Sequence, residues 1–131
     1  MIRGRASLIL PFALVCAGCL DARSRAIKTV DRVNAERLRA DVAKYYKDVF
    51  AEHRKTIVTL NPKYHSWAFR QLEPDRVTAY PDGFAFCLER SGDAESGLYV
   101  VPIGMDHKPK PTSWASFERL SDGIYWYTFT P

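Results

Sequence analysis

The chain has 131 residues, of which 47% are hydrophobic and 13% aromatic, and its 19 Lys and Arg residues against 15 Asp and Glu residues give a formal net charge of +4. This length supports one domain of ordinary size and excludes two. A charge this small, with both signs interspersed, argues against a polyanion-binding protein, and no nucleic-acid partner is expected.

The first nineteen residues combine a basic start, a short apolar run and small residues before a cysteine. Arg3 and Arg5 precede the apolar run of residues 6–17, and the segment closes with Cys16-Ala17-Gly18-Cys19. This order resembles a bacterial lipoprotein signal peptide, although that family usually has Leu where Cys16 stands. The resemblance implies a signal peptide over residues 1–18 and a diacylglycerol thioether on Cys19.

Other interpretations of this start stay open. An ordinary secretory peptide cut after Ala17 would give a secreted or periplasmic soluble protein, and a fortuitous apolar start would leave the protein in the cytoplasm. The apolar run is shorter than the roughly 20 residues that a membrane-spanning helix needs. In lipoproteins of the kind that this segment resembles, an aspartate directly after the modified cysteine often marks inner-membrane retention. This chain has Leu20 at that position. The expected place is therefore the cell envelope, at the outer membrane facing the periplasm if the host has one.

After the signal, we expect a tether over residues 19–26 and a single domain over residues 27–131. Loss of Arg3 and Arg5 with the signal lowers the formal charge by 2, from +4 to +2. Four basic residues follow the proposed anchor, at Arg23, Arg25, Lys28 and Arg32. Each would gain roughly 1 kcal/mol at an anionic leaflet. The aspartates among them favour the simpler interpretation of a solvated helix start.

Residues 24–53 have the apolar spacing of an amphipathic helix. The apolar positions recur three or four residues apart, at Val30, Leu38, Val42, Tyr45 and Val49. Asn34 interrupts this pattern, and as an N-cap it would divide the segment in two. One helix and two helices are both compatible with the sequence.

The remainder alternates short β-branched and aromatic runs with turn residues. We expect strands at residues 56–60, 66–72, 76–80, 84–89, 98–103, 114–120 and 124–130. Pro81-Asp82-Gly83 and Ser121-Asp122-Gly123 predict hairpins, and residues 91–97 and 105–113 read as loops. The sequence therefore predicts an α+β fold, in which an N-terminal amphipathic helix packs on a five- or six-stranded antiparallel meander as a two-layer roll.

The final run has large side chains on both faces. Tyr125, Tyr127 and Phe129 alternate with Ile124 and Trp126. Period-two alternation places the first three on one face of the sheet and the other two on the opposite face. A central strand would cover both faces better than an edge strand would.

Residues with catalytic or metal-binding chemistry are few. No phosphate loop, nucleophile elbow or paired-cysteine motif occurs in the sequence, so neither a cofactor nor a catalytic residue is predicted. The spacing of His53, His65 and His107 matches no local metal pattern, and no metal is expected. Cys87 lies in an apolar run, which predicts a buried, unreactive thiol.

The best candidate for a binding surface is the proline-containing loop before residue 114. Its candidate residues are His107, Lys108, Pro109, Lys110, Pro111 and Trp114. A stiff loop beside aromatic residues can bind a partner with little loss of conformational entropy, although a plain connecting loop would have the same composition.

Three functional hypotheses follow. The first is a lipid-anchored binding module with an envelope protein as its partner. The second is an envelope hydrolase or transferase with His65 or His107 as the base. The third is an inhibitor or immunity-type protein against a secreted enzyme.

Overall fold

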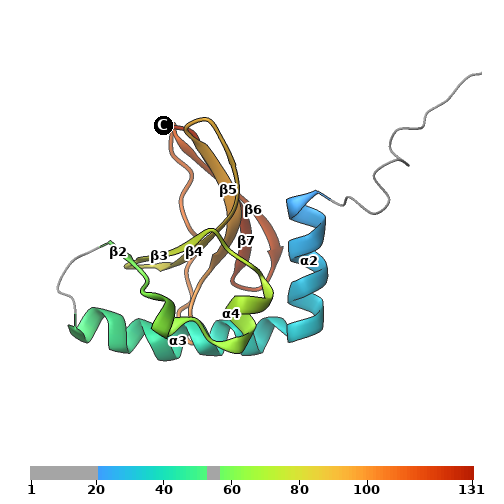
Figure 1. Ribbon diagram of the computed structural model, residues 1–131. Helices are drawn as coiled ribbons and strands as arrows, with labels where there is room; N and C mark the ends of the chain where they lie inside the picture. Colours follow the sequence, from blue (N-terminus) through green and yellow to red (C-terminus); the bar gives the residue numbers. More distant parts are fainter. Residues whose placement is uncertain (1–20, 53–56) are drawn as a thin grey trace, which may run out of the picture.

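The computed structural model describes residues 21–52 and 57–131, in which helices lie against a strongly twisted sheet (Figure 1). The helices are α2 (Ala22–Val33), α3 (Ala35–Glu52) and α4 (Trp67–Gln71), with a 3-10 turn η2 (Pro62–Tyr64). The strands are β2 (Val58–Thr59), β3 (Arg76–Tyr80), β4 (Gly83–Ser91), β5 (Ala94–Val100), β6 (Ala115–Ser121) and β7 (Ile124–Phe129). The predicted α+β class is confirmed, and the antiparallel sheet has six strands, where five or six were expected. The proposed signal peptide, Cys19 and His53 lie outside the described residues.

The helical segment is divided in two at Asn34. The backbone N–H of Asn34 donates to Val30 O at the end of α2, and its side-chain oxygen accepts from the N–H groups of Glu36 and Arg37 at the start of α3. Asn34 has a φ of 80°, outside the helical region, so neither helix continues through it. The interpretation with two helices is therefore the correct one. α2 begins at Ala22, so residues 22–26 of the expected tether are helical.

The helices contribute to the larger of two apolar cores. Val30 of α2 and Leu38 of α3 are buried in one cluster with Phe84 of β4 and Leu98 of β5. In Figure 1, α3 runs along the base of the sheet while α2 stands beside β6 and β7. An ion pair of 2.6 Å from Arg23 to Glu118 joins α2 to β6.

The predicted strand at residues 66–72 is wrong, because these residues form α4. The Ser66 side chain accepts from the N–H of Phe69 and caps the helix. Ala68, Phe69 and Leu72 are all buried, which is helical spacing. Trp67 is 43% exposed, and the guanidinium of Arg37 lies 4.7 Å from its ring centroid.

The strand order is β2-β3-β4-β5-β7-β6, with antiparallel pairing throughout. It departs from a simple meander because β7, the last strand, lies between β5 and β6. Both predicted hairpins are present, at β3–β4 and β6–β7. The loop expected at residues 91–97 is shorter than predicted, since β5 already begins at Ala94.

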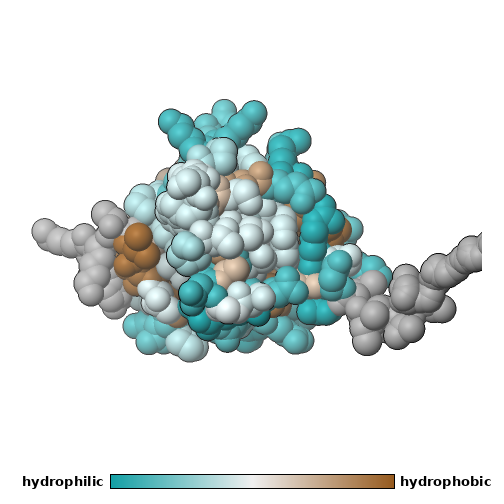
Figure 2. All heavy atoms as spheres, turned by 90° about the horizontal axis from the view of Figure 1, so that it is seen from above, coloured by the Kyte–Doolittle hydropathy of each residue, from teal (hydrophilic) through white to brown (hydrophobic). Residues whose placement is uncertain are grey.

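Register irregularities interrupt two of the strand pairs. They lie between Cys87 and Glu89 on β4 and between Arg119 and Ser121 on β6. Such irregularities increase the local twist of a sheet. Seen from above, pale residues of intermediate hydropathy lie at the centre of the molecule, teal hydrophilic residues cover much of its edge, and a brown hydrophobic patch lies at the left (Figure 2).

Candidate functional site

The sheet face opposite the larger core carries a second, aromatic core. Its buried members are Ala85, Tyr99, Val101, Tyr125 and Tyr127, and its half-buried members are Tyr80, Met105, Phe117 and Phe129. Alternation along β7 supplies three of them, as the sequence predicted, while Ile124 belongs to the larger core. Both faces of the sheet are thus apolar, although they differ in the side chains that fill them.

The rings of the aromatic core contact one another across several strands. Tyr80 on β3 and Phe129 on β7 have centroids 6.2 Å apart, although β4 and β5 lie between these strands. Three strand spacings amount to about 14 Å in a flat sheet. The rings therefore lean together over a curled sheet, and this face is a packed layer of side chains.

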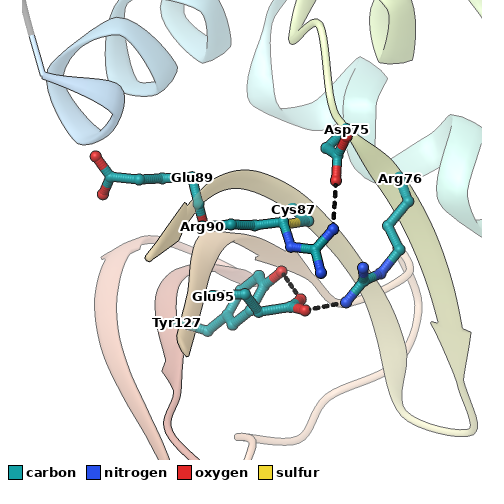
Figure 3. A network of polar contacts seen from close by, with 7 residues as sticks. All are labelled: Asp75, Arg76, Cys87, Glu89, Arg90, Glu95 and Tyr127. Carbon is teal, nitrogen blue, oxygen red and sulfur yellow. Dashed lines mark hydrogen bonds and ion pairs between the residues drawn. The ribbon is translucent and has the colours of Figure 1, made fainter. Parts of the chain in front are cut away.

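A polar network borders the aromatic core (Figure 3). Tyr127 Oη donates to Glu95 Oε2 over 2.7 Å, and Arg76 donates to the other oxygen of Glu95. Beside this pair, Arg90 contacts the carboxylate of Asp75 at 3.2 Å. Burial, together with the hydrogen bond to Glu95, raises the pKa of Tyr127, so its hydroxyl stays protonated at neutral pH. The network therefore joins strands of the sheet, and its polar groups already have partners within the protein.

Cys87 lies next to this network and is 1% exposed. Its Sγ is 3.9 Å from the carbonyl oxygen of Glu89, and burial raises the pKa of the thiol. A raised pKa keeps sulfur in the weakly nucleophilic thiol form. The predicted buried thiol is confirmed.

The loop between β5 and β6, residues 101–114, runs the whole length of β7. At its start the N–H of Val101 donates to Gly123 O, and at its end Trp114 O accepts from the N–H of Thr130. Gly123 and Thr130 flank β7 on either side. This segment, here called the proline loop, lies against the aromatic core through Met105.

The six candidate residues of the proline loop have different environments. His107 is half-buried, Pro109 is buried, and Lys108, Lys110 and Pro111 are exposed. Trp114 is 48% exposed, and its ring lies edge-on to Phe129 with centroids 5.3 Å apart. The structure therefore separates them along the loop, with the two prolines in different environments.

His107 attaches the proline loop to the β3–β4 hairpin. Its Nε2 lies 2.9 Å from the carbonyl oxygen of Asp82 and 4.0 Å from the carboxylate of that residue. The same carboxylate accepts from the hydroxyl of Tyr99, whose pKa is raised by burial and by this hydrogen bond. A histidine held in this way positions the loop.

His65 lies at the end of η2, near the larger core. Its Nε2 is buried and has no hydrogen-bond partner among the described residues, and burial lowers its pKa. Its ring centroid lies 6.5 Å from that of Phe69. Within residues 21–52 and 57–131, no group of three or more side chains is arranged to hold a metal ion.

Sequence reasoning missed a cavity of about 330 Å³ between α3, the proline loop and the β6–β7 hairpin. Its wall includes Arg39, His107, Lys108, Arg119 and Tyr125. Arg39 gave no signal in the sequence, because it is one of several charged residues on an amphipathic helix. Its role depends on contacts with residues more than sixty positions away.

Comparisons with protein-family models, curated proteins and solved structures find no match for this chain. In the part of the chain that the structure describes, no helix combines the length and apolar character needed to cross a bilayer.

Proposed function

We propose that this chain is a lipid-anchored cell-envelope protein whose domain binds a partner protein through the surface around Trp114. One observation carries the binding proposal: the Trp114 ring is 48% exposed and is held against Phe129. A large ring that is already fixed loses little conformational entropy on binding, and tryptophan is enriched among residues that dominate interface energy.

The backbone around Trp114 supports the same proposal. The N–H of Thr130 donates to Trp114 O over 2.7 Å, and the N–H of Thr112 donates to Ala115 O over 2.8 Å. Pro111 restricts the chain immediately before this point. The loop end is thus ordered before any partner arrives, which lowers the entropic cost of association.

The anchor is supported by the lipoprotein-like residues before Cys19. Only Leu20 and Asp21 separate Cys19 from the first residue of α2. A lipid on Cys19 would hold the domain close to the membrane and raise its local concentration near an envelope partner.

In the proposed two-layer roll, α2 and α3 form one layer and the sheet forms the other, which leaves the opposite sheet face to the proline loop.

Site-specific crosslinking in native cells tests the binding proposal. A photoreactive residue replaces Trp114 in one variant and Trp67, which is 43% exposed on α4, in a matched control. We expect one defined protein adduct from position 114 and none of the same mass from position 67. A third variant carries the photoreactive group at the exposed position Lys110 and should give the same adduct. Adding Trp114→Ala to this variant should remove that adduct. Identical adducts from positions 114 and 67 would contradict the proposal.

The anchor has its own test. The intact mass of the N-terminal peptide from the native protein should show Cys19 as the first residue, carrying a diacylglycerol. An unmodified Cys19, or a mature start at Gly18, would refute the lipid anchor and favour the secreted form. The hydrolase and inhibitor hypotheses stay predictions.

A further inference from the structure

The cavity beside Arg39 has the character of a binding site for a small anion. It measures about 330 Å³ and opens between α3, the first half of the proline loop and the β6–β7 hairpin. We propose that it binds a small ligand through a carboxylate or phosphate group of that ligand. This site lies on the part of the proline loop that begins at β5, whereas the proposed protein-binding residue Trp114 lies at the other end.

The charges on the wall favour an anion. Three basic residues, Arg39, Lys108 and Arg119, line the cavity together with two acidic residues, Asp106 and Asp122. One of these carboxylates is already engaged, since Arg119 Nη2 lies 2.6 Å from Asp122 Oδ1. Arg39 and Lys108 make no ion pair with any described residue, so two cations stay available for an incoming oxyanion.

Arg39 is the fixed element of this site. Its Nε donates to Val101 O over 2.9 Å, and its Nη2 donates to Pro102 O over 3.3 Å and lies 3.5 Å from Met105 O. These bonds hold the plane of the guanidinium in one orientation. An arginine held in this way offers a positive charge at a fixed place to a carboxylate or phosphate.

The glycine at the β6–β7 turn makes room for Arg39. A Cβ atom on Gly123 would lie 2.3 Å from Cζ of Arg39, so the guanidinium rests directly against the glycine backbone. Gly123 also has a φ of +69°. Glycine therefore suits the turn through its backbone angle, and it leaves room for the arginine.

One edge of the Arg39 guanidinium has no hydrogen-bond partner among the described residues. Nη1 makes no hydrogen bond to any residue in 21–52 or 57–131, and the partners of Nε and Nη2 are neutral carbonyl groups. A half-buried cation without a counterion is unfavourable relative to a paired one. An anion in the cavity would supply both the missing charge and the missing acceptor.

A titration of the full chain, purified in detergent, tests the site. Inorganic phosphate and succinate serve as separate probes at constant ionic strength, and NMR follows the backbone amides of Lys108 and Gly123. We expect saturable shifts with at least one probe. Saturation by phosphate alone would assign a phosphate group, and saturation by succinate alone a carboxylate. The absence of saturable shifts with both would overturn the proposal.

Two lysines of the same loop provide matched variants. Lys108→Gln removes a cation from the wall, whereas Lys110→Gln makes the same change at an exposed position that does not line the cavity. We expect Lys108→Gln to weaken binding of the saturating probe at least fivefold and Lys110→Gln to change it less than twofold. Equal weakening by both would mean general charge attraction and would refute a defined site. Neither lysine anchors the loop, so folding is expected to persist.

Discussion

Tyr127 on β7 donates a hydrogen bond of 2.7 Å to Oε2 of Glu95 on β5. The other carboxylate oxygen of Glu95 accepts from Arg76 on β3, across the intervening strand β4. The Glu95 side chain is 14% exposed, and Tyr127 is fully buried. A single carboxylate therefore connects three strands, and each donor offsets part of the cost of removing that charge from water.

Removal of the Tyr127 hydroxyl should destabilise the fold. We expect Tyr127→Phe to lower the free energy of unfolding by about 1 to 3 kcal/mol, because a mostly buried carboxylate loses a donor. Urea denaturation monitored by circular dichroism measures the loss. Tyr125→Phe is the matched control, since it removes the same atom from a hydroxyl that has no hydrogen bond to the described residues. Equal losses in the two variants would contradict this account of Glu95.

Two substitutions of Asn34, the residue between α2 and α3, should lower the unfolding free energy by different amounts. Asn34→Ala removes the acceptor for Glu36 and Arg37 and leaves alanine, which tolerates a positive φ less well than asparagine, at a φ of 80°. We expect a loss of about 2 kcal/mol in unfolding free energy, from the missing cap and the unfavourable φ together. Asn34→Gly loses the side-chain cap but tolerates the φ, so its loss should be about 1 kcal/mol. Equal losses would show that the backbone angle contributes nothing.

Gly97 on β5 should tolerate no side chain. A Cβ atom there would lie 1.8 Å from the carbonyl oxygen of Phe86, and backbone atoms cannot move aside by rotation. We expect Gly97→Ala to cost more than about 3 kcal/mol or to prevent folding. Gly92→Ala is the control at the β4–β5 turn, where no atom lies within 4 Å of the added Cβ and the φ of +61° costs about 1 kcal/mol. Thermal unfolding compares them, and a wild-type Tm for Gly97→Ala would contradict the prediction.

His65 predicts a pH dependence of stability. Burial lowers its pKa in the folded state, so the unfolded chain binds the proton more readily. The folded state is therefore favoured fully above the unfolded pKa of about 6.5 and loses this contribution as the pH falls through and below that value. Between pH 7.5 and 5.5, we expect the unfolding free energy of the wild type to fall more than that of His65→Gln. Parallel pH profiles for wild type and His65→Gln would contradict the role of His65.

Local features of the structure followed from the sequence more readily than distant contacts did. The break at Asn34 was one of two open interpretations, because the side chain that caps a helix acts on residues only two or three positions away. The strand predicted at residues 66–72 was wrong for a related reason. Alternation of Trp67 and Phe69 over so few residues fits a strand as well as it fits the short helix that Ser66 caps.

Some features of the candidate site were likewise predictable from the local sequence, whereas others depend on distant contacts. A loop at residues 105–113 was predictable, because prolines restrict their own neighbourhood. The buried position of Pro109 and the attachment of His107 to Asp82 were not, since both depend on the β3–β4 hairpin coming to rest beside the loop. The role of Arg39 was not predictable either, because all three of its acceptors lie more than sixty residues further along the chain.

By itself, the sequence determined the α+β class, the two hairpins and the alternation of β7, which places Tyr125, Tyr127 and Phe129 on one face and Ile124 and Trp126 on the other. These depend on turn residues and on a period of two, which act over a few positions. Only the tertiary structure decided that β7 lies between β5 and β6, that Glu95 joins three strands and that Arg39 borders a cavity. Such contacts join residues far apart in the chain, and they form because the whole domain must bury its apolar faces and pair its buried charges at once.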